Sequence, residues 1–172
     1  ADHSKGMKTL FVIGAPLQSD GKIYNCAVAI NDGNILGVVP KSYLPTYGEF
    51  YEKRWFAEGR SFPGTTIHCG GKSVPCGTDI IFSCDNFEEL KVGIEICEDL
   101  WSVTPPSNRL VSCGATLIVN PSASNEIVGK QQYRRKLIEM HSATCLAGYA
   151  YASSGPNESS TDTVYSGYGC VA

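Results

Sequence analysis

Short apolar runs separated by turn residues organise the first half of the chain. Residues 9–14 are apolar and β-branched, which predicts a buried strand. Two more strands are expected over 23–30 and 35–39. Asn31-Asp32-Gly33-Asn34 between them has the turn chemistry of a hairpin. The same pattern predicts later strands over 80–82, 91–97, 116–119, 149–152 and 163–165.

Two segments have helical character instead. Residues 105–113 begin with two prolines and stop before a glycine, which predicts a short helix. Residues 127–147 predict a long helix that stops at Gly148, with apolar positions at Leu137, Met140 and Cys145. Loops are expected over 40–64 and, as a glycine-rich turn, over 68–75.

The order of these elements indicates the fold class. Strands alternate with helices, and hairpins also occur, so we predict an α/β domain with mixed sheets. The first strand starts almost at once, no initiator Met precedes it, and the pattern stops without a closing element. We therefore expect residues 1–172 to be one incomplete domain, truncated at both ends.

Composition narrows the class of protein. Hydrophobic residues make up 42% of the chain and charged residues 18%, which is typical of a globular domain. The net charge is −3, with no run of Lys and Arg to bind a phosphate backbone. No apolar stretch is long enough to span a bilayer. Nucleic acid and membrane are therefore not expected as partners.

The chain has eight cysteines, but their spacing does not indicate a metal site. No CxxC pair occurs, and only three histidines are present. Several of the cysteines lie in apolar runs, where a free thiol behaves as a small hydrophobic group. We therefore expect free thiols, no bound metal and a cytoplasmic location.

Cys97 is the candidate nucleophile. It ends the predicted strand 91–97, and strand ends are where α/β folds present reactive groups. A tight turn after a strand also directs backbone N–H groups toward one point. From the residues alone, a buried structural cysteine is the alternative.

Lys41 directly follows the predicted strand 35–39. Facing the nucleophile, its ammonium would favour the thiolate and stabilise an oxyanion; otherwise it is a solvated charge. Glu49 and Glu52 could orient it or be exposed acids in the loop. Tyr47 could line a pocket or pack in the core.

A third polar segment, residues 119–125, leaves a strand just before the long helix. Its small hydroxyl residues either cap the helix or form a wall for a small polar substrate. Arg134 and Arg135 on the helix are expected at the surface or in ion pairs. The residues by themselves indicate an α/β enzyme with a Cys and a Lys.

Four segments, in order, resemble one family. Residues 41–54 resemble the lysine loop of the nitrilase superfamily, and 93–101 resemble its nucleophile motif. Residues 120–124, followed by Gly129-Lys130, resemble the substrate-binding segment, and 158–162 a later loop. Together they are similar to the glutaminase domain of glutamine-dependent NAD synthetases.

This resemblance implies a nitrilase-type α-β-β-α sandwich with two mixed sheets between helical layers. It also implies that Cys97 attacks the side-chain amide of glutamine and forms a thioester. Lys41 and the backbone N–H of Glu98 would stabilise the oxyanion. The implied supporting residue is Glu49, and the implied substrate-binding residues are Tyr47, Ser124 and Lys130.

The chain departs from the family pattern in one respect. The general-base Glu of the superfamily should precede the lysine loop, but the only acids before Lys41 are Asp2, Asp20 and Asp32. We expect this base to lie outside the chain and the chain alone to hydrolyse glutamine poorly. By resemblance, ammonia would pass to a separate synthetase domain that uses ATP and magnesium to convert deamido-NAD to NAD. The resemblance also implies a homo-oligomer.

Two other functions fit parts of the pattern. Another nitrilase-type amidase or carbamoylase would act on a free amide without a synthetase partner. A truncated, non-catalytic module would serve only in assembly.

Overall fold

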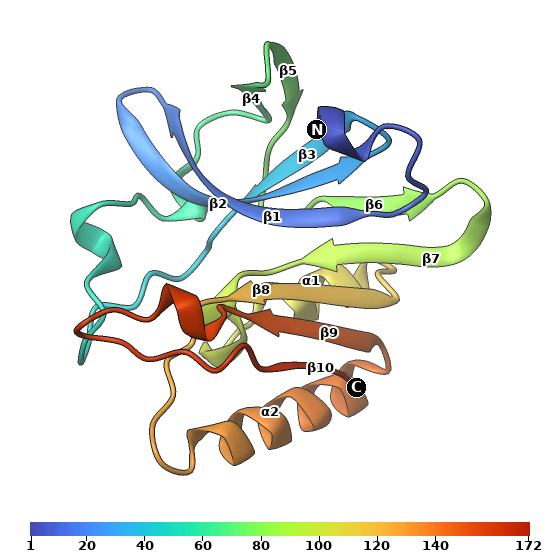
Figure 1. Ribbon diagram of the computed structural model, residues 1–172. Helices are drawn as coiled ribbons and strands as arrows, with labels where there is room; N and C mark the ends of the chain where they lie inside the picture. Colours follow the sequence, from blue (N-terminus) through green and yellow to red (C-terminus); the bar gives the residue numbers. More distant parts are fainter.

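The computed structural model describes residues 1–172, which form two packed sheets with both helices on one side (Figure 1). The strands are β1 (Phe11–Ser19), β2 (Lys22–Asn31), β3 (Asn34–Pro40), β4 (Thr66–Cys69), β5 (Lys72–Pro75), β6 (Ile81–Cys84), β7 (Phe87–Ile94), β8 (Leu117–Ser122), β9 (Gly148–Ser153) and β10 (Gly169–Val171). The helices are α1 (Pro106–Ser112) and α2 (Lys130–Cys145). Five short 3-10 helices span Asp2–Ser4, Glu52–Arg54, Gly59–Ser61, Cys97–Trp101 and Pro156–Glu158.

The two large sheets differ in strand direction. The first is an antiparallel meander in the order β1-β2-β3. The second has the order β10-β9-β8-β7-β6, with β7, β8 and β9 parallel and an antiparallel strand at each edge. Because parallel neighbours need crossover connections, α1 joins β7 to β8 and α2 joins β8 to β9.

Small residues allow the two sheets to pack face to face. Ala27 and Ala29 of β2 are fully buried against the branched side chains of β7, among them Val92 and Ile94. On its other face the five-stranded sheet packs against both helices, through a cluster that contains Leu110 of α1 and Ile138 of α2. The core therefore has three layers: sheet, sheet and helices.

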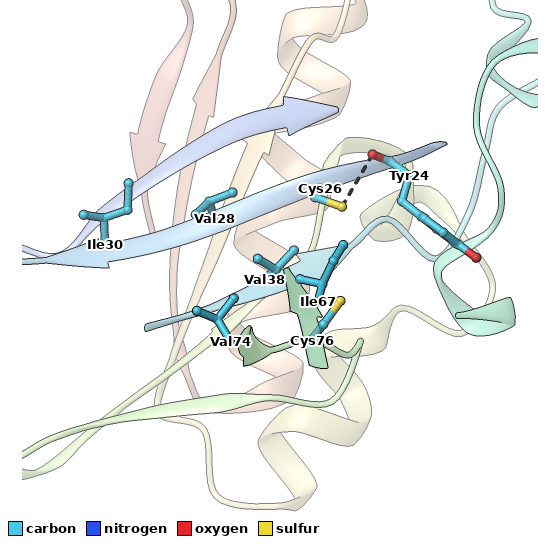
Figure 2. Packing of buried hydrophobic residues seen from close by; sticks show 8 residues of the cluster. All are labelled: Tyr24, Cys26, Val28, Ile30, Val38, Ile67, Val74 and Cys76. Atoms are coloured by element: carbon cyan, nitrogen blue, oxygen red, sulfur yellow. Dashed lines mark hydrogen bonds between the residues drawn. The ribbon is translucent and has the colours of Figure 1, made fainter. Parts of the chain in front are cut away.

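The outer face of β1-β2-β3 is covered by a small hairpin and not by a helix (Figure 2). Side chains of β2 alternate with period 2, so that Tyr24, Cys26, Val28 and Ile30 all point to this face. Ile67 of β4 and Val74 of β5 close over them. The two sides of this cluster are Tyr24, Cys26, Val28, Ile30 and Val38 from the sheet, and Ile67, Val74 and Cys76 from the hairpin segment.

The predicted α/β class with two sheets is confirmed, with differences in detail. The β1-β2-β3 sheet is antiparallel where a mixed sheet was expected, and helices cover one outer face only. The turn expected over 68–75 is the β4–β5 hairpin, with Gly70 and Gly71 in left-handed conformations at its tip. No strand forms over 163–165; instead β10 completes the sheet edge. No helix has the length and apolarity needed to cross a membrane.

Helix α2 buries one narrow face. Arg134 and Ile138, four residues apart, are both 0% exposed, whereas Met140, expected on the apolar face, is 65% exposed. The 3.6-residue period explains the outcome, because Met140 lies about half a turn away from Ile138.

Substitution of Ile138 by Ala should lower the free energy of unfolding by about 3 kcal/mol, because it leaves a cavity between α2 and the five-stranded sheet. Met140→Ala is the matched control on the exposed face and should change stability by less than about 0.5 kcal/mol. Urea unfolding followed by circular dichroism measures both. Equal losses in the two variants would contradict the packing of α2 described above.

Candidate active site

Three segments meet at one edge of the two sheets, each just after a strand. They are the loop after β3, the turn after β7 and the segment after β8. Figure 1 shows β7, β8 and β9 running toward the same edge, where the loop after β3 also lies. Lys41, Cys97 and Ser124 follow these three strands. The carboxyl ends of parallel strands are the usual place for a site in α/β folds.

Cys97 is the first residue of the 3-10 helix Cys97–Trp101, on the tight turn that follows Ile96, and its backbone is strained. Its φ is 48°, a left-handed conformation that residues other than glycine rarely adopt. Its backbone N–H donates to Asn120 Oδ1 at 2.9 Å. The next backbone N–H, that of Glu98, donates to no group within the chain. The turn therefore presents a half-buried thiol beside one uncommitted backbone donor, as an oxyanion hole requires.

Lys41 is 1% exposed, and its charge is balanced by Glu52. The ammonium donates to Glu52 Oε1 at 2.7 Å and to Oε2 at 2.9 Å. An ammonium has three N–H groups, so one remains after the two bonds to Glu52. The resemblance assigned the supporting role to Glu49, but in the structure Glu49 accepts a hydrogen bond from Asn125.

The backbone of the loop explains why Glu52, and not Glu49, reaches Lys41. The amide of Phe50 donates to Tyr47 O at 3.0 Å, and that of Glu52 donates to Pro45 O at 3.1 Å. These turns fold the loop back on itself and return residue 52 to the end of β3. The chain then crosses the backbone of Lys41 at Gly59, where a Cβ atom would lie 2.5 Å from Pro40 O. Only glycine permits this approach.

Asp99 connects the lysine loop to the nucleophile turn. Its buried carboxylate accepts the amides of Ser42 at 3.1 Å, Tyr43 at 2.8 Å and Ile96 at 2.9 Å. Burial raises the pKa of the Asp99 carboxyl, and the amides of Ile96 and Ser42 oppose that shift. One side chain thus holds the segments after Lys41 and before Cys97 together.

A cavity of about 360 Å³ opens beside Cys97. This volume is at the lower end of the range for small-molecule sites. The predicted substrate-binding residues Tyr47, Ser124 and Lys130 all line it, together with Cys97 and Glu98, whereas Lys41 and Glu49 do not. Its other walls are largely apolar: Pro45, Phe50, Trp101, Ile127, Val128, Gly129 and Tyr133.

Two opposite charges face this cavity. The two carboxylate oxygens of Glu98 accept the Tyr47 hydroxyl at 2.8 Å and 2.9 Å. Burial raises the pKa of the Glu98 carboxyl, and the hydrogen bond from Tyr47 opposes this shift. Burial also lowers the pKa of the Lys130 ammonium, which lies 5.7 Å from the centre of the Phe50 ring. A half-buried anion and cation in one cavity suit a ligand that carries both charges.

The wall after β8 is held mainly through backbone groups. Ser124 bonds through its backbone N–H and C=O, which leaves its hydroxyl uncommitted. Asn125 bridges Lys130 and Glu49. Arg134, expected at the surface or in an ion pair, is fully buried and pairs with Glu126, whereas Arg135 forms an exposed pair with Glu139.

Four side chains that form hydrogen bonds at the site had no role predicted from the sequence: those of Glu98, Asp99, Asn120 and Asn125. The side chains of Glu98 and Asp99 follow Cys97 in sequence and could have been found there as acids beside a nucleophile. Asn120 and Asn125 lie in the polar segment after β8, but nothing in their spacing indicates their partners. No group of three or more His, Cys, Asp or Glu side chains is arranged to hold a metal ion.

Comparison with known proteins identifies the family. The sequence matches the carbon-nitrogen hydrolase family over residues 1–172. This chain belongs to the carbon-nitrogen hydrolase family. The resemblance to nitrilase-type proteins inferred from the motifs is thereby confirmed.

The relatives of this member of the carbon-nitrogen hydrolase family include much longer proteins. It is 45% identical over 165 residues to the glutamine-dependent NAD(+) synthetase of Mycobacterium bovis, covering 96% of this chain and 24% of the relative. The enzyme of the same name from Thermotoga maritima is 32% identical, with 89% and 23% covered. The chain thus spans about a quarter of the length of these curated relatives.

Solved structures show the same fold. The glutamine-dependent NAD(+) synthetase of Cytophaga hutchinsonii superposes with a TM-score of 0.79 at 29% identity, covering 94% of this chain and 25% of that one. Nit3 of Saccharomyces cerevisiae, a member of the nitrilase superfamily, gives a TM-score of 0.68 at 22% identity, with 98% and 53% covered. The second similarity shows the fold alone.

Glu52→Gln should lower the free energy of unfolding by about 3 kcal/mol, because it leaves the buried Lys41 without its counter-charge. Glu49→Gln is the matched control in the same loop. It should cost less than about 1 kcal/mol, since the new amide oxygen can still accept from Asn125. Chemical denaturation of both variants measures the difference. A larger loss for Glu49→Gln would show that Glu49 is the partner of Lys41 in solution.

Proposed function

We propose that this carbon-nitrogen hydrolase cleaves the side-chain amide of glutamine, giving glutamate and ammonia. The observation that carries the proposal is the pair of opposite charges, Glu98 and Lys130, in the cavity beside Cys97. Free glutamine carries an ammonium and a carboxylate at one end and an uncharged amide at the other. Two relatives, at 45% and 32% identity, have names that include glutamine dependence and support the same substrate.

We infer the following steps, for which this chain would supply the nucleophile and the donors to the oxyanion. The Cys97 sulfur attacks the carboxamide carbon, and the carbonyl oxygen becomes an oxyanion. The Glu98 backbone N–H and the remaining N–H of Lys41 donate to it. The carbon–nitrogen bond then breaks, the nitrogen takes the thiol proton and leaves as ammonia, and a thioester remains. Water cleaves the thioester to glutamate and restores the thiol.

The charged groups would fix the other end of glutamine. Glu98 binds the α-ammonium, and Lys130 binds the α-carboxylate. The phenol of Tyr47 holds Glu98 in place, and the uncommitted hydroxyl of Ser124 donates to the substrate. An amidase for simple amides would not need this pair, so the charges favour glutamine over that alternative.

The general base is assigned to a residue outside this chain. The carboxylates around Cys97 already accept hydrogen bonds: Glu52 from Lys41, Glu95 from Tyr149, Glu98 from Tyr47 and Asp99 from backbone amides. Without a base, hydrolysis by this chain alone would be slower by roughly 10²–10⁴-fold.

In the proposed whole protein, ammonia passes to a synthetase domain that uses ATP and magnesium to amidate deamido-NAD. The names of the relatives support this role, as does the quarter of their length that this chain covers. Residues 1–172 are then part of the glutamine amidotransferase domain of a cytoplasmic homo-oligomer. Light scattering of the whole protein tests the oligomer, and a monomer would contradict it.

Labelling of Cys97 tests the substrate. A chloroketone analogue of glutamine should alkylate this chain at Cys97 alone among its eight cysteines, as located by peptide mass spectrometry. Excess glutamine should protect Cys97 because it occupies the same cavity. Butyramide at the same concentration, the matched control without charges, should protect at least tenfold less.

Two outcomes would contradict the proposal in different ways. Equal protection by butyramide would point to an amidase for simple amides. Labelling scattered over several cysteines, with no protection by glutamine, would point to a non-catalytic module.

The raised pKa of Glu98 predicts a pH dependence of binding. As the pH falls, Glu98 takes up a proton at a higher pH than an ordinary glutamate does, because its pKa is raised. The neutral carboxyl then no longer attracts the ammonium of glutamine. The glutamine concentration that half-protects Cys97 should therefore rise below that pH. Glu98→Gln should raise this concentration at neutral pH and remove the pH dependence. Glu88→Gln, at an exposed position of β7, should behave as wild type.

A further inference from the structure

A fully buried carboxylate lies two residues before the nucleophile, and the proposed mechanism does not use it. Glu95 is 0% exposed. Its Oε2 accepts the backbone N–H of Ser107 at 2.9 Å, and its Oε1 accepts the hydroxyl of Tyr149 at 2.5 Å. A buried acid with only two donors costs stability compared with an apolar residue. Its presence behind Cys97 therefore calls for a functional reason.

The hydrogen bonds continue from Glu95 to the nucleophile. The Tyr149 oxygen, which donates its proton to Glu95, accepts from Asn120 Nδ2 at 2.9 Å. The other atom of the same amide, Asn120 Oδ1, accepts the backbone N–H of Cys97 at 2.9 Å. Asn120 is itself 0% exposed, so water does not compete for these bonds.

Glu95 determines which group donates and which accepts in each hydrogen bond of this series. A carboxylate only accepts, so Tyr149 must donate to it and has only its lone pairs left for Asn120. Asn120 must then turn its NH₂ toward Tyr149, which leaves its oxygen toward Cys97. Burial and the charge of Glu95 raise the pKa of Tyr149 well above its usual value, so the phenol keeps the proton that it donates.

We propose that Glu95, Tyr149 and Asn120 are positioning residues for the reaction of Cys97. Together they form a one-directional hydrogen-bond relay that holds the Cys97 peptide in its left-handed conformation. The inference rests on the proposed function and deepens it, because it states how the nucleophile is held.

The relay also selects the donor of the oxyanion hole. Two successive N–H groups, those of Cys97 and Glu98, lie on the same turn. Asn120 Oδ1 accepts a hydrogen bond from the Cys97 N–H, and the Glu98 N–H has no partner in the chain. Were Asn120 to flip, its NH₂ would face the Cys97 N–H, and two donors would repel one another. The turn would then relax from its strained φ of 48° and move both the thiol and the Glu98 amide.

Tyr149→Phe tests the relay because it removes one oxygen and with it both bonds of the central link. The ring stays, and so does its edge-to-face contact with His141 at 5.7 Å. The matched control is Tyr151→Phe on the same strand, since the Tyr151 hydroxyl is buried without a hydrogen-bond partner. Each variant of the 172-residue chain is treated with the chloroketone analogue of glutamine over a range of concentrations.

The rate constant for alkylation of Cys97 at saturating reagent should fall about 10- to 100-fold in Tyr149→Phe, the loss expected for a small misplacement of reacting atoms. The reagent concentration giving half this rate should stay within about twofold, because Tyr47, Glu98 and Lys130 are unchanged. A general loss of structure would instead raise that concentration as well. Tyr151→Phe should keep both constants within about twofold of wild type.

Glu95→Gln provides a second variant that keeps the shape of the side chain. Its amide can still accept one bond but no longer enforces the direction of the relay. It should lower the saturating rate, and the double variant Glu95→Gln/Tyr149→Phe should be no slower than Tyr149→Phe, since both act through one chain of bonds.

Failure of the relay and failure of the proposed function give different results. Protection of wild-type Cys97 by glutamine, together with unchanged saturating rates in Tyr149→Phe and Glu95→Gln, would overturn the relay alone. The absence of glutamine protection in the wild-type chain would overturn the proposed function. Losses that add in the double variant would show that Glu95 and Tyr149 act separately, and would also overturn the relay.

Discussion

The site depends on the hydrogen bonds that the Asp99 carboxylate accepts from the backbone amides of Ser42, Tyr43 and Ile96. Lys41 belongs to one sheet and Cys97 to the other, and sheets that pack through apolar side chains alone can slide by fractions of an ångström. Directional bonds to one buried side chain prevent this, because each amide must lie within a narrow range of distance and angle. Gly59 completes the arrangement by allowing the chain to lie directly on the Lys41 backbone.

Stability and chemistry make opposite demands on this edge of the fold. The core behind it is assembled from small and branched apolar residues. The edge contains a cysteine with a strained backbone, a buried Lys and three buried or half-buried acids: Glu95, Glu98 and Asp99. Each of these features is unfavourable by itself. Every one of them has a partner from a different segment, which is how a fold retains a site that local interactions would not keep.

The two sides of Cys97 carry out separate tasks. On the cavity side, Glu98 and Lys130 supply the charges that suit an amino-acid substrate. On the core side, the relay from Glu95 through Tyr149 to Asn120 determines how the nucleophile is presented. Glu95 precedes Cys97 and is buried in the core, whereas Glu98 follows it in the 3-10 helix and lines the cavity, so one short motif supplies residues to both sides.

Local patterns in the sequence determined most elements of the fold and predicted which residues are reactive. Period-2 and period-3.6 spacing located most strands and both helices. Positions after strands predicted Cys97 and Lys41, and the family resemblance added Tyr47, Ser124 and Lys130. All of these except Lys41 line one cavity in the structure. The β4–β5 hairpin was missed because its glycine turn is a stronger signal than its four-residue strands.

Only the tertiary structure decided which groups pair. Glu52 and not Glu49 holds Lys41, Arg134 is buried, and the Cys97 amide is taken by Asn120 while that of Glu98 remains uncommitted. The physical reason is that the identity and spacing of residues specify local conformation, whereas hydrogen-bond and ion partners depend on distances of tenths of an ångström between segments up to 76 positions apart. Those distances exist only once the two sheets have packed.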